Sequence, residues 1–221
     1  MTPYLDFHTH AKGCEKYTSN HEVVVIQSLH ISETPHPRAD YVTIGIHPML
    51  QGAKQILESY KEAPSKTIDH LLCIFSSSST PVIGIGECGW DIRSELSLAD
   101  QSRLVEMQII ISRELRLPMI FHIVKAWHLL LSKRKQSHSV TPWIVHGFRG
   151  RHRLYSQLTD AGIAVSLHPL SASPFSGNFF LETDDTPTSI IKHYNDRGYD
   201  TETERCRLIN LFYNTFGLTY R

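Results

Sequence analysis

Six residues of the types that bind transition metals follow short apolar runs along this chain. Each run is rich in Val, Ile or Phe, as expected for buried β-strands. Imidazole nitrogens and carboxylate oxygens that arrive from several strand ends are typical of a metal centre. Four imidazoles and two carboxylates favour Zn, Mn, Ni or Fe over Mg or Ca. The six residues are His8, His10, Glu87, His122, His146 and Asp184.

The number of these residues predicts two ions, because six protein ligands exceed the four of a closed structural zinc site. Residues two apart on a strand point the same way, so His8 and His10 can bind one ion together with Asp184. The other two histidines would bind the second ion, and Glu87 would bridge the pair. Paired ions about 3.5–4 Å apart activate water for hydrolysis. We therefore expect a hydrolase in which Glu87 and Asp184 are catalytic and Asp184 steers or deprotonates the water.

The elements that must position these residues alternate along the chain. Alternating strands and helices predict a parallel sheet, and eight strands predict an α/β fold of the TIM-type (β/α)8 barrel class. Three connections, 8–22, 28–40 and 168–178, are too short or too Pro-rich for good helices, so the barrel should be small and irregular, with some helices reduced. The expected strands are Tyr4–Phe7, Val23–Gln27, Tyr41–Ile46, Val82–Gly86, Met119–His122, Trp143–His146, Ile163–Leu167 and Phe179–Glu182. The expected helices are Lys54–Leu72, Ser97–Arg116, Lys125–Lys135, Arg151–Ala161 and Thr201–Phe212.

Composition limits the surroundings in which the chain works. At 221 residues, we expect residues 1–221 to form a single domain. Lys plus Arg and Asp plus Glu number 22 each, so no global field attracts nucleic acid. The four dispersed cysteines predict reduced thiols in the cytoplasm. No apolar run approaches the length of a membrane span, and we expect no obligate protein partner.

The motifs around the six residues occur in an order that resembles the TatD family of metal-dependent deoxyribonucleases, within the amidohydrolase-like barrels. The resemblance spans nearly the whole chain, and the ordered set is more specific than any single motif. The matching segments are Asp6 to His10, Gly45-Ile46-His47-Pro48, Gly86 to Asp91, Gln101, Leu117 to His122, His146 to Gly150, Glu182-Thr183-Asp184 and Asn210 to Gly217.

The resemblance implies a distorted TIM barrel with two divalent ions that hydrolyses phosphodiesters, often as an exonuclease on DNA. The metal ligands of the family fall on the same six residues. The chain departs from the family pattern in loops that the resemblance implies bind the substrate. Lys125 is displaced by one position from the usual basic residue, Arg149 replaces a usual Ser, and the Pro-rich loop after Asp184 is reduced.

Several further residues have both a functional and a structural interpretation. His47, Lys125 and Arg149 are predicted to contact substrate phosphates, with a neighbouring loop or plain surface charge as the alternative. Trp90 could stack on a base, although packing over the barrel mouth is favoured. Asp6 could orient a histidine. The role of His168 stays open.

Three functions remain in competition. The leading hypothesis is a phosphodiesterase or deoxyribonuclease with two divalent ions, Zn, Mn or Mg, whose substrate is DNA or another nucleotide phosphodiester. The same site could instead hydrolyse a small amide, ester or lactone, because one barrel supports many chemistries. The third hypothesis is a non-catalytic, metal-stabilised binding protein.

Overall fold

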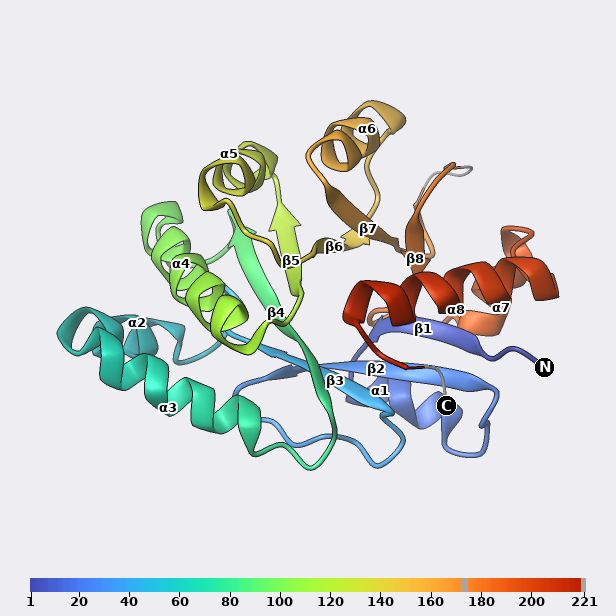
Figure 1. Ribbon diagram of the computed structural model, residues 1–221, viewed down its shortest axis with the longest axis horizontal. Helices are drawn as coiled ribbons and strands as arrows, with labels where there is room; N and C mark the ends of the chain where they lie inside the picture. Colours follow the sequence, from blue (N-terminus) through green and yellow to red (C-terminus); the bar gives the residue numbers. More distant parts are fainter. Residues whose placement is uncertain (172–174, 220–221) are drawn as a thin grey trace.

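Eight parallel strands form one sheet in the order of the chain, and Figure 1 shows helices around the strands. The computed structural model describes residues 1–171 and 175–219. The strands are β1 (Tyr4–Thr9), β2 (Val23–His30), β3 (Tyr41–Gly45), β4 (Val82–Asp91), β5 (Met119–Val124), β6 (Trp143–Phe148), β7 (Ile163–Leu167) and β8 (Phe179–Leu181).

The sheet curls into a nearly closed barrel, because its last strand returns to its first. Beyond β8, the backbone N–H of Asp184 donates to the carbonyl of His8 over 2.9 Å. Thr9 and Asp184 form an isolated parallel bridge at the same point. The barrel predicted from the sequence is confirmed, and its closure brings the two ends of the ligand series together.

Helices cover the outside of the barrel over much of its circumference. They are α1 (Ala11–Cys14), the 3-10 turn η1 (Glu15–Tyr17), α2 (Ala53–Glu62), α3 (Pro64–Ser76), α4 (Leu98–Leu115), α5 (Trp127–Ser137), α6 (His152–Asp160), α7 (Ile190–Asp196) and α8 (Glu202–Phe216). The side chain of Ser97 accepts from the N–H of Asp100 at the start of α4, and Thr201 accepts from Glu204 at the start of α8. Both helices therefore begin with a side-chain N-terminal cap.

The single helix expected over Lys54–Leu72 is wrong, because the chain forms α2 and α3 there. Pro64 begins α3, and Ala63 before it has a φ of −143°. A proline has no N–H to continue the preceding helix, and it disfavours the α conformation of the residue before it.

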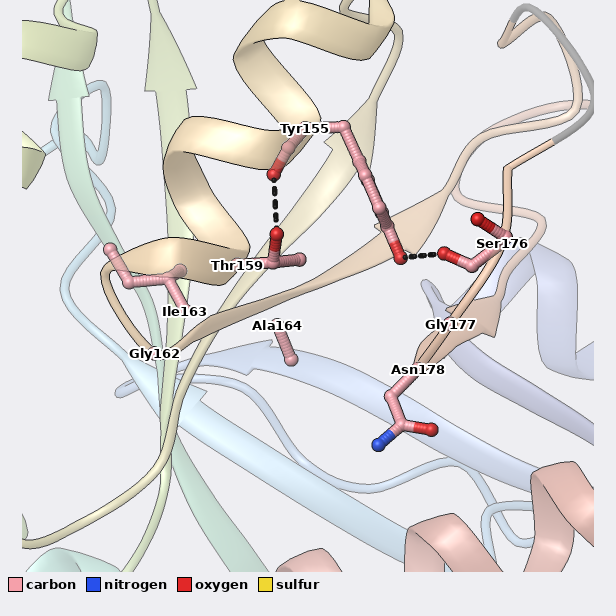
Figure 2. A pocket seen from close by; sticks show the side chains of 8 residues that line it. All are labelled: Tyr155, Thr159, Gly162, Ile163, Ala164, Ser176, Gly177 and Asn178. Carbon is pink, nitrogen blue, oxygen red and sulfur yellow. Dashed lines mark hydrogen bonds between the residues drawn. The ribbon is translucent and has the colours of Figure 1, made fainter.

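One side of the barrel has reduced helices, as expected. The connection from β1 to β2 contains only α1, of four residues, and η1, of three. The fully described segment 31–40 contains no helix. Between β7 and β8, a hollow lies beside α6, where the Tyr155 hydroxyl donates to the Ser176 carbonyl over 2.8 Å (Figure 2). This hollow adjoins Ile163, at the start of β7, so it lies at the opposite edge of the barrel from the ligand residues.

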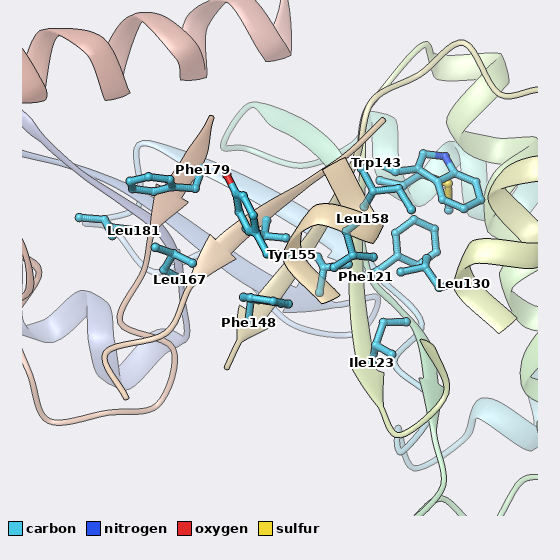
Figure 3. Packing of buried hydrophobic residues seen from close by; sticks show 14 of the residues in the cluster. Phe121, Ile123, Leu130, Trp143, Phe148, Tyr155, Leu158, Leu167, Phe179 and Leu181 are labelled. Carbon is cyan, nitrogen blue, oxygen red and sulfur yellow. The ribbon is translucent and has the colours of Figure 1, made fainter. Parts of the chain in front are cut away.

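The core has an inner and an outer layer. The inner layer combines strand residues such as Ile120, Ile144 and Phe180 with Ile209 and Phe212 of α8. The outer layer packs the other faces of β5 to β8 against the helices, and Figure 3 shows its aromatic and branched side chains. Among the described residues, no helix is long and apolar enough to cross a bilayer.

Candidate metal centre

The carboxylate of Glu87 lies at the centre of the histidine cluster. Its side chain, from β4, is 5% exposed. Oε1 lies 3.3 Å from Nε2 of His8 and 3.4 Å from Nε2 of His10. Oε2 lies 2.8 Å from Nε2 of His146 and 3.4 Å from Nδ1 of His122. Each oxygen therefore faces a different pair of histidines, as a bridging ligand would.

The alternation of strand side chains accounts for the inward direction of the histidines on β5 and β6. Ile120 and Ile144 belong to the inner layer of the core. His122 and His146 follow them by two residues, so they point the same way, nearer the carboxyl ends of the strands. On both strands, an isoleucine therefore packs in the core and the histidine two residues later faces the site.

Asp184 completes the group beside His8 and His10. Its Oδ1 lies 3.5 Å from Nε2 of His10, and possible ligand atoms of His8, His10 and Asp184 all lie within 4.8 Å of one another. Asp184 has a φ of 51°, in the left-handed region that aspartate tolerates better than most residues. This conformation turns the chain from β8 toward β1.

His8 gives the clearest sign that this cluster suits a cation. Its side chain is 1% exposed, and its Nε2 has no hydrogen-bond partner among the described residues. A buried ring nitrogen without a partner is costly, whereas a metal ion would occupy its lone pair. The residues therefore fit a site for transition-metal ions.

Asp91 fixes the orientation of His122, a role that the sequence analysis did not assign. Its Oδ2 lies 3.1 Å from Nε2 of His122 and also binds the guanidinium of Arg93. Burial disfavours the Asp91 carboxylate, but its bonds to Arg93 and His122 hold its pKa below the ordinary value. A proton on Nε2 of His122, donated to Asp91, leaves the lone pair of Nδ1 facing Glu87.

Glu182 has the corresponding place beside His146, and it was also missed as a functional residue. Its Oε1 accepts from the N–H of Gly147 over 2.7 Å and lies 3.8 Å from Nδ1 of His146. In the described part of the chain, Nδ1 of His146 and Oε2 of Glu182 are both buried without a hydrogen bond. Glu182 follows the inner-layer residue Phe180 by two, which is the sequence signal that could have found it.

His47 also reaches the cluster, with a different protonation. Its Nδ1 accepts from the N–H of Met49 over 3.1 Å, so a neutral ring carries its proton on Nε2. That nitrogen lies 3.6 Å from Oε2 of Glu87. Burial lowers the pKa of His47 to about 3, against the attraction of Glu87, so the ring is a neutral donor that faces the site.

The two carboxylates of the cluster are ionised at neutral pH. Burial disfavours charge on Glu87, but His146 and His8 hold its pKa well below the ordinary value. Burial also opposes charge on Asp184, whose pKa is lowered by His10 and His8. The pKa of His10 rises to about 9, because contact with Asp184 and the charge of Glu87 outweigh burial. Ionised carboxylates are the form that binds metal.

The remaining predicted residues occupy different positions. Lys125 is exposed just after β5, with a φ of 54°. Arg149 is exposed just after β6, and its Nη2 lies 2.8 Å from Nε2 of His168, after β7. All three therefore lie at the carboxyl ends of the strands, on the side of the cluster. Trp90 is fully buried in the outer layer of the core and donates to Ser102, so both base stacking and a position over the barrel mouth are wrong.

Asp6 does not orient a histidine, contrary to the expectation. Its carboxylate accepts from the N–H of Thr183 over 2.9 Å and from the Thr183 hydroxyl over 2.7 Å. It also accepts from the hydroxyl of Tyr17 over 2.9 Å. Asp6 therefore holds the Glu182-Thr183-Asp184 segment against β1, and it acts on the cluster through the backbone that carries Asp184.

Comparison with known proteins agrees with this geometry. The chain is 27% identical over 146 residues to tatdn3 of Danio rerio, a protein named as a deoxyribonuclease. The match covers 64% of this chain and 53% of that protein. It is 27% identical over 140 residues to the 3'-5' ssDNA/RNA exonuclease TatD of Pectobacterium carotovorum, covering 60% of this chain and 47% of that protein. The chain thus spans about half the length of the curated relatives it matches.

The fold is shared with a solved structure over almost its full length. The TatD homolog YJJV of Escherichia coli superposes with a TM-score of 0.66 at 17% identity, covering 98% of each chain. The family described as TatD related DNase matches residues 6–176, which include five of the six predicted ligands and end before Asp184. By this match, the chain belongs to the family of TatD-related deoxyribonucleases.

Proposed function

We propose that this protein is a divalent-metal-dependent phosphodiesterase that hydrolyses DNA or a related nucleotide ester. The observation that carries the proposal is the position of Glu87, whose two carboxylate oxygens face separate histidine pairs. Family membership and the names of the two curated relatives support phosphodiester hydrolysis. The chain spans about half the length of those relatives, so we propose DNA as the substrate instead of transferring it from them.

In this proposal, Glu87 would contribute one carboxylate oxygen to each of two ions. His8, His10 and Asp184 would hold one ion, and His122 and His146 the other. When bound, such ions neutralise charge that develops on a phosphoryl group and make water more acidic. Asp91 would keep the lone pair of His122 directed inward, and the charge of Glu182, 3.8 Å from Nδ1 of His146, would favour the same orientation there. The histidines suit Zn or Mn, and Mg would need assistance from the substrate.

Two side chains would act directly on the reacting groups. Asp184 is ionised and half-buried, so its carboxylate is suited to accept a hydrogen bond from the attacking water and to orient it. His47 would donate its Nε2–H to a non-bridging phosphate oxygen, because its Nδ1 is already an acceptor for Met49.

Lys125 and Arg149 would bind the substrate outside the centre. Both are exposed cations at the carboxyl ends of neighbouring strands. Phosphate contacts of this kind position a nucleic acid without reading its sequence. We also propose that residues 1–221 act as one unit, supported by the contacts that join Asp184 to β1, and that the protein works in the cytoplasm, supported by its four free thiols.

A substrate panel tests the proposal against its alternative. Chelator-stripped protein is supplied with Mg, Mn or Zn and offered end-labelled single-stranded DNA, RNA, bis(p-nitrophenyl) phosphate, a lactone and an anilide. We expect metal-dependent cleavage of the phosphodiesters and none of the carbonyl substrates. Cleavage restricted to the lactone or anilide would replace the phosphodiesterase with a carbonyl hydrolase.

A further inference from the structure

The pair formed by Arg149 and His168 contains a conflict of hydrogen-bond donors. Nδ1 of His168 accepts from the backbone N–H of Leu170 over 3.0 Å, and Nε2 lies 2.8 Å from Nη2 of Arg149. A neutral imidazole has one lone pair and one N–H. Both neighbours are donors, so in either tautomer one N–H of the ring faces another N–H. The pair therefore lacks an acceptor.

The backbone around His168 is held firmly, so the conflict is not relieved by a free loop. Nη2 of Arg197 donates to the carbonyl of Ser171 over 2.8 Å and to that of Pro169 over 3.2 Å. Nε of Arg197 binds His193, whose other nitrogen lies 3.0 Å from the carbonyl of Glu182. This chain of bonds joins the segment 168–171 to the backbone beside the metal centre.

The position of the pair is suited to a substrate that extends beyond the metals. Arg149 follows β6 and His168 follows β7, and the N–H of His168 contacts the carbonyl of Phe148 over 3.4 Å. His168 is 1% exposed, whereas Arg149 is exposed. The buried donor, His168, is thus fixed in place, whereas the exposed donor, Arg149, is at the surface. If the exposed Arg149 side chain moves outward from this 2.8 Å contact, an anionic oxygen would accept from both its guanidinium and the Nε2–H of His168, leaving the lone pair of Nδ1 to Leu170.

We propose that Arg149 and His168 form a pocket for a second phosphate of the substrate, next to the one that is hydrolysed. This deepens the proposed function and rests on it. The pocket would make the protein select nucleotide chains, which carry successive phosphates, over esters with a single phosphate. A guanidinium paired with an imidazole N–H is a suitable donor set for phosphate oxygens.

The kinetic test compares two substrates in the metal-loaded enzyme. For Arg149→Ala and His168→Ala, we expect KM on a short oligothymidylate to rise about tenfold or more, with little change on bis(p-nitrophenyl) phosphate. Arg149→Lys should recover part of the loss. Arg151→Ala is the matched control, because the guanidinium of Arg151 forms no hydrogen bond or ion pair within residues 1–171 and 175–219.

Equal losses on both substrates, unchanged kinetics, or an equal effect of Arg151→Ala would overturn the pocket. The last result would indicate a diffuse basic surface. A binding measurement distinguishes failure of the pocket from failure of the proposed function. Titration of inorganic pyrophosphate into the chelator-treated protein, followed by calorimetry, should show binding that both alanine variants weaken about tenfold and Arg151→Ala preserves. If the wild-type protein cleaves nothing, this titration alone decides for or against the pocket.

Discussion

At the scale of single residues, the candidate centre depends on carboxylates that orient its histidines. Asp91 and Glu182 each lie beside a different histidine of the pair that faces Oε2 of Glu87. Partners of this kind set the tautomer and direction of an imidazole. We expect both carboxylates to contribute to metal affinity through the histidines.

Replacing Glu182 by Gln tests this role. The variant keeps an oxygen for the N–H of Gly147 but loses the charge beside Nδ1 of His146. We expect a folded protein with Zn affinity and kcat reduced about 10- to 100-fold. Calorimetric titration of Zn and steady-state kinetics measure both. Glu95→Gln, at an exposed site, is the control. Wild-type affinity and rate in Glu182→Gln would remove Glu182 from the centre.

The inward-facing histidines could be predicted from the sequence, but the carboxylates that contact them could not. His122 and His146 could be recognised because they follow branched strand residues. The bond of Asp91 to His122 was not predictable, because it depends on how the residues after the bulge in β4 meet β5. For the same reason, the strand expected over Val82–Gly86 is too short, because β4 continues to Asp91 and includes Trp90.

At the scale of elements, α7 links the metal side of β8 to the segment after β7. This seven-residue helix was missed by the sequence analysis, since so short a segment gives little periodicity. Its residue His193 is 2% exposed, between the carbonyl of Glu182 and Arg197. Burial first, and then the charge of Arg197, lower the pKa of His193 to about 4.

This shift predicts a loss of stability in mild acid. The unfolded chain takes up a proton near pH 6.5, whereas folded His193 does so only near pH 4, so its contribution is complete above pH 6.5 and falls as the pH drops to 4. The loss should reach about 3 kcal/mol at most. Urea unfolding of chelated protein at several pH values measures it. His193→Asn should flatten this part of the profile, and an unchanged profile would contradict the assignment.

The N-terminal cap of α4 gives a second test of an element, remote from the chemistry. Ser97 accepts from the N–H of Asp100 over 3.1 Å. Ser97→Ala should lower the free energy of unfolding by about 1 kcal/mol, because one helix N–H loses its partner. Chemical denaturation measures the change, and hydrolysis should continue at the wild-type rate. A large loss of activity would show that α4 supports the site more directly than its contacts indicate.

At the scale of the whole molecule, the candidate metal centre lies at the closure of the barrel. The first and last strands meet where the N–H of Asp184 donates to His8, and both residues are predicted ligands. The overall barrel was predictable from eight apolar runs and their spacing. The helix break at Pro64 and the contacts that close the barrel were less predictable, because they depend on local backbone geometry and on contacts between distant parts of the chain.

Metal binding should therefore stabilise the entire barrel. At a free ion concentration 100 times the Kd, binding adds about 2.7 kcal/mol to the free energy of unfolding. For a chain of this size, that corresponds to a rise in Tm of roughly 5–10 °C. Differential scanning calorimetry of chelated and Zn-loaded protein measures the shift. Identical melting temperatures would argue against any structural centre at His8 and Asp184.

The most direct test of the central claim is the rate of end-labelled single-stranded DNA hydrolysis by wild-type protein and Glu87→Ala, each stripped of metal and resupplied with Mg, Mn or Zn. The account predicts metal-dependent shortening of DNA by the wild type and its abolition in a variant that remains folded by circular dichroism. Hydrolysis by Glu87→Ala at the wild-type rate would contradict a catalytic centre bridged by Glu87.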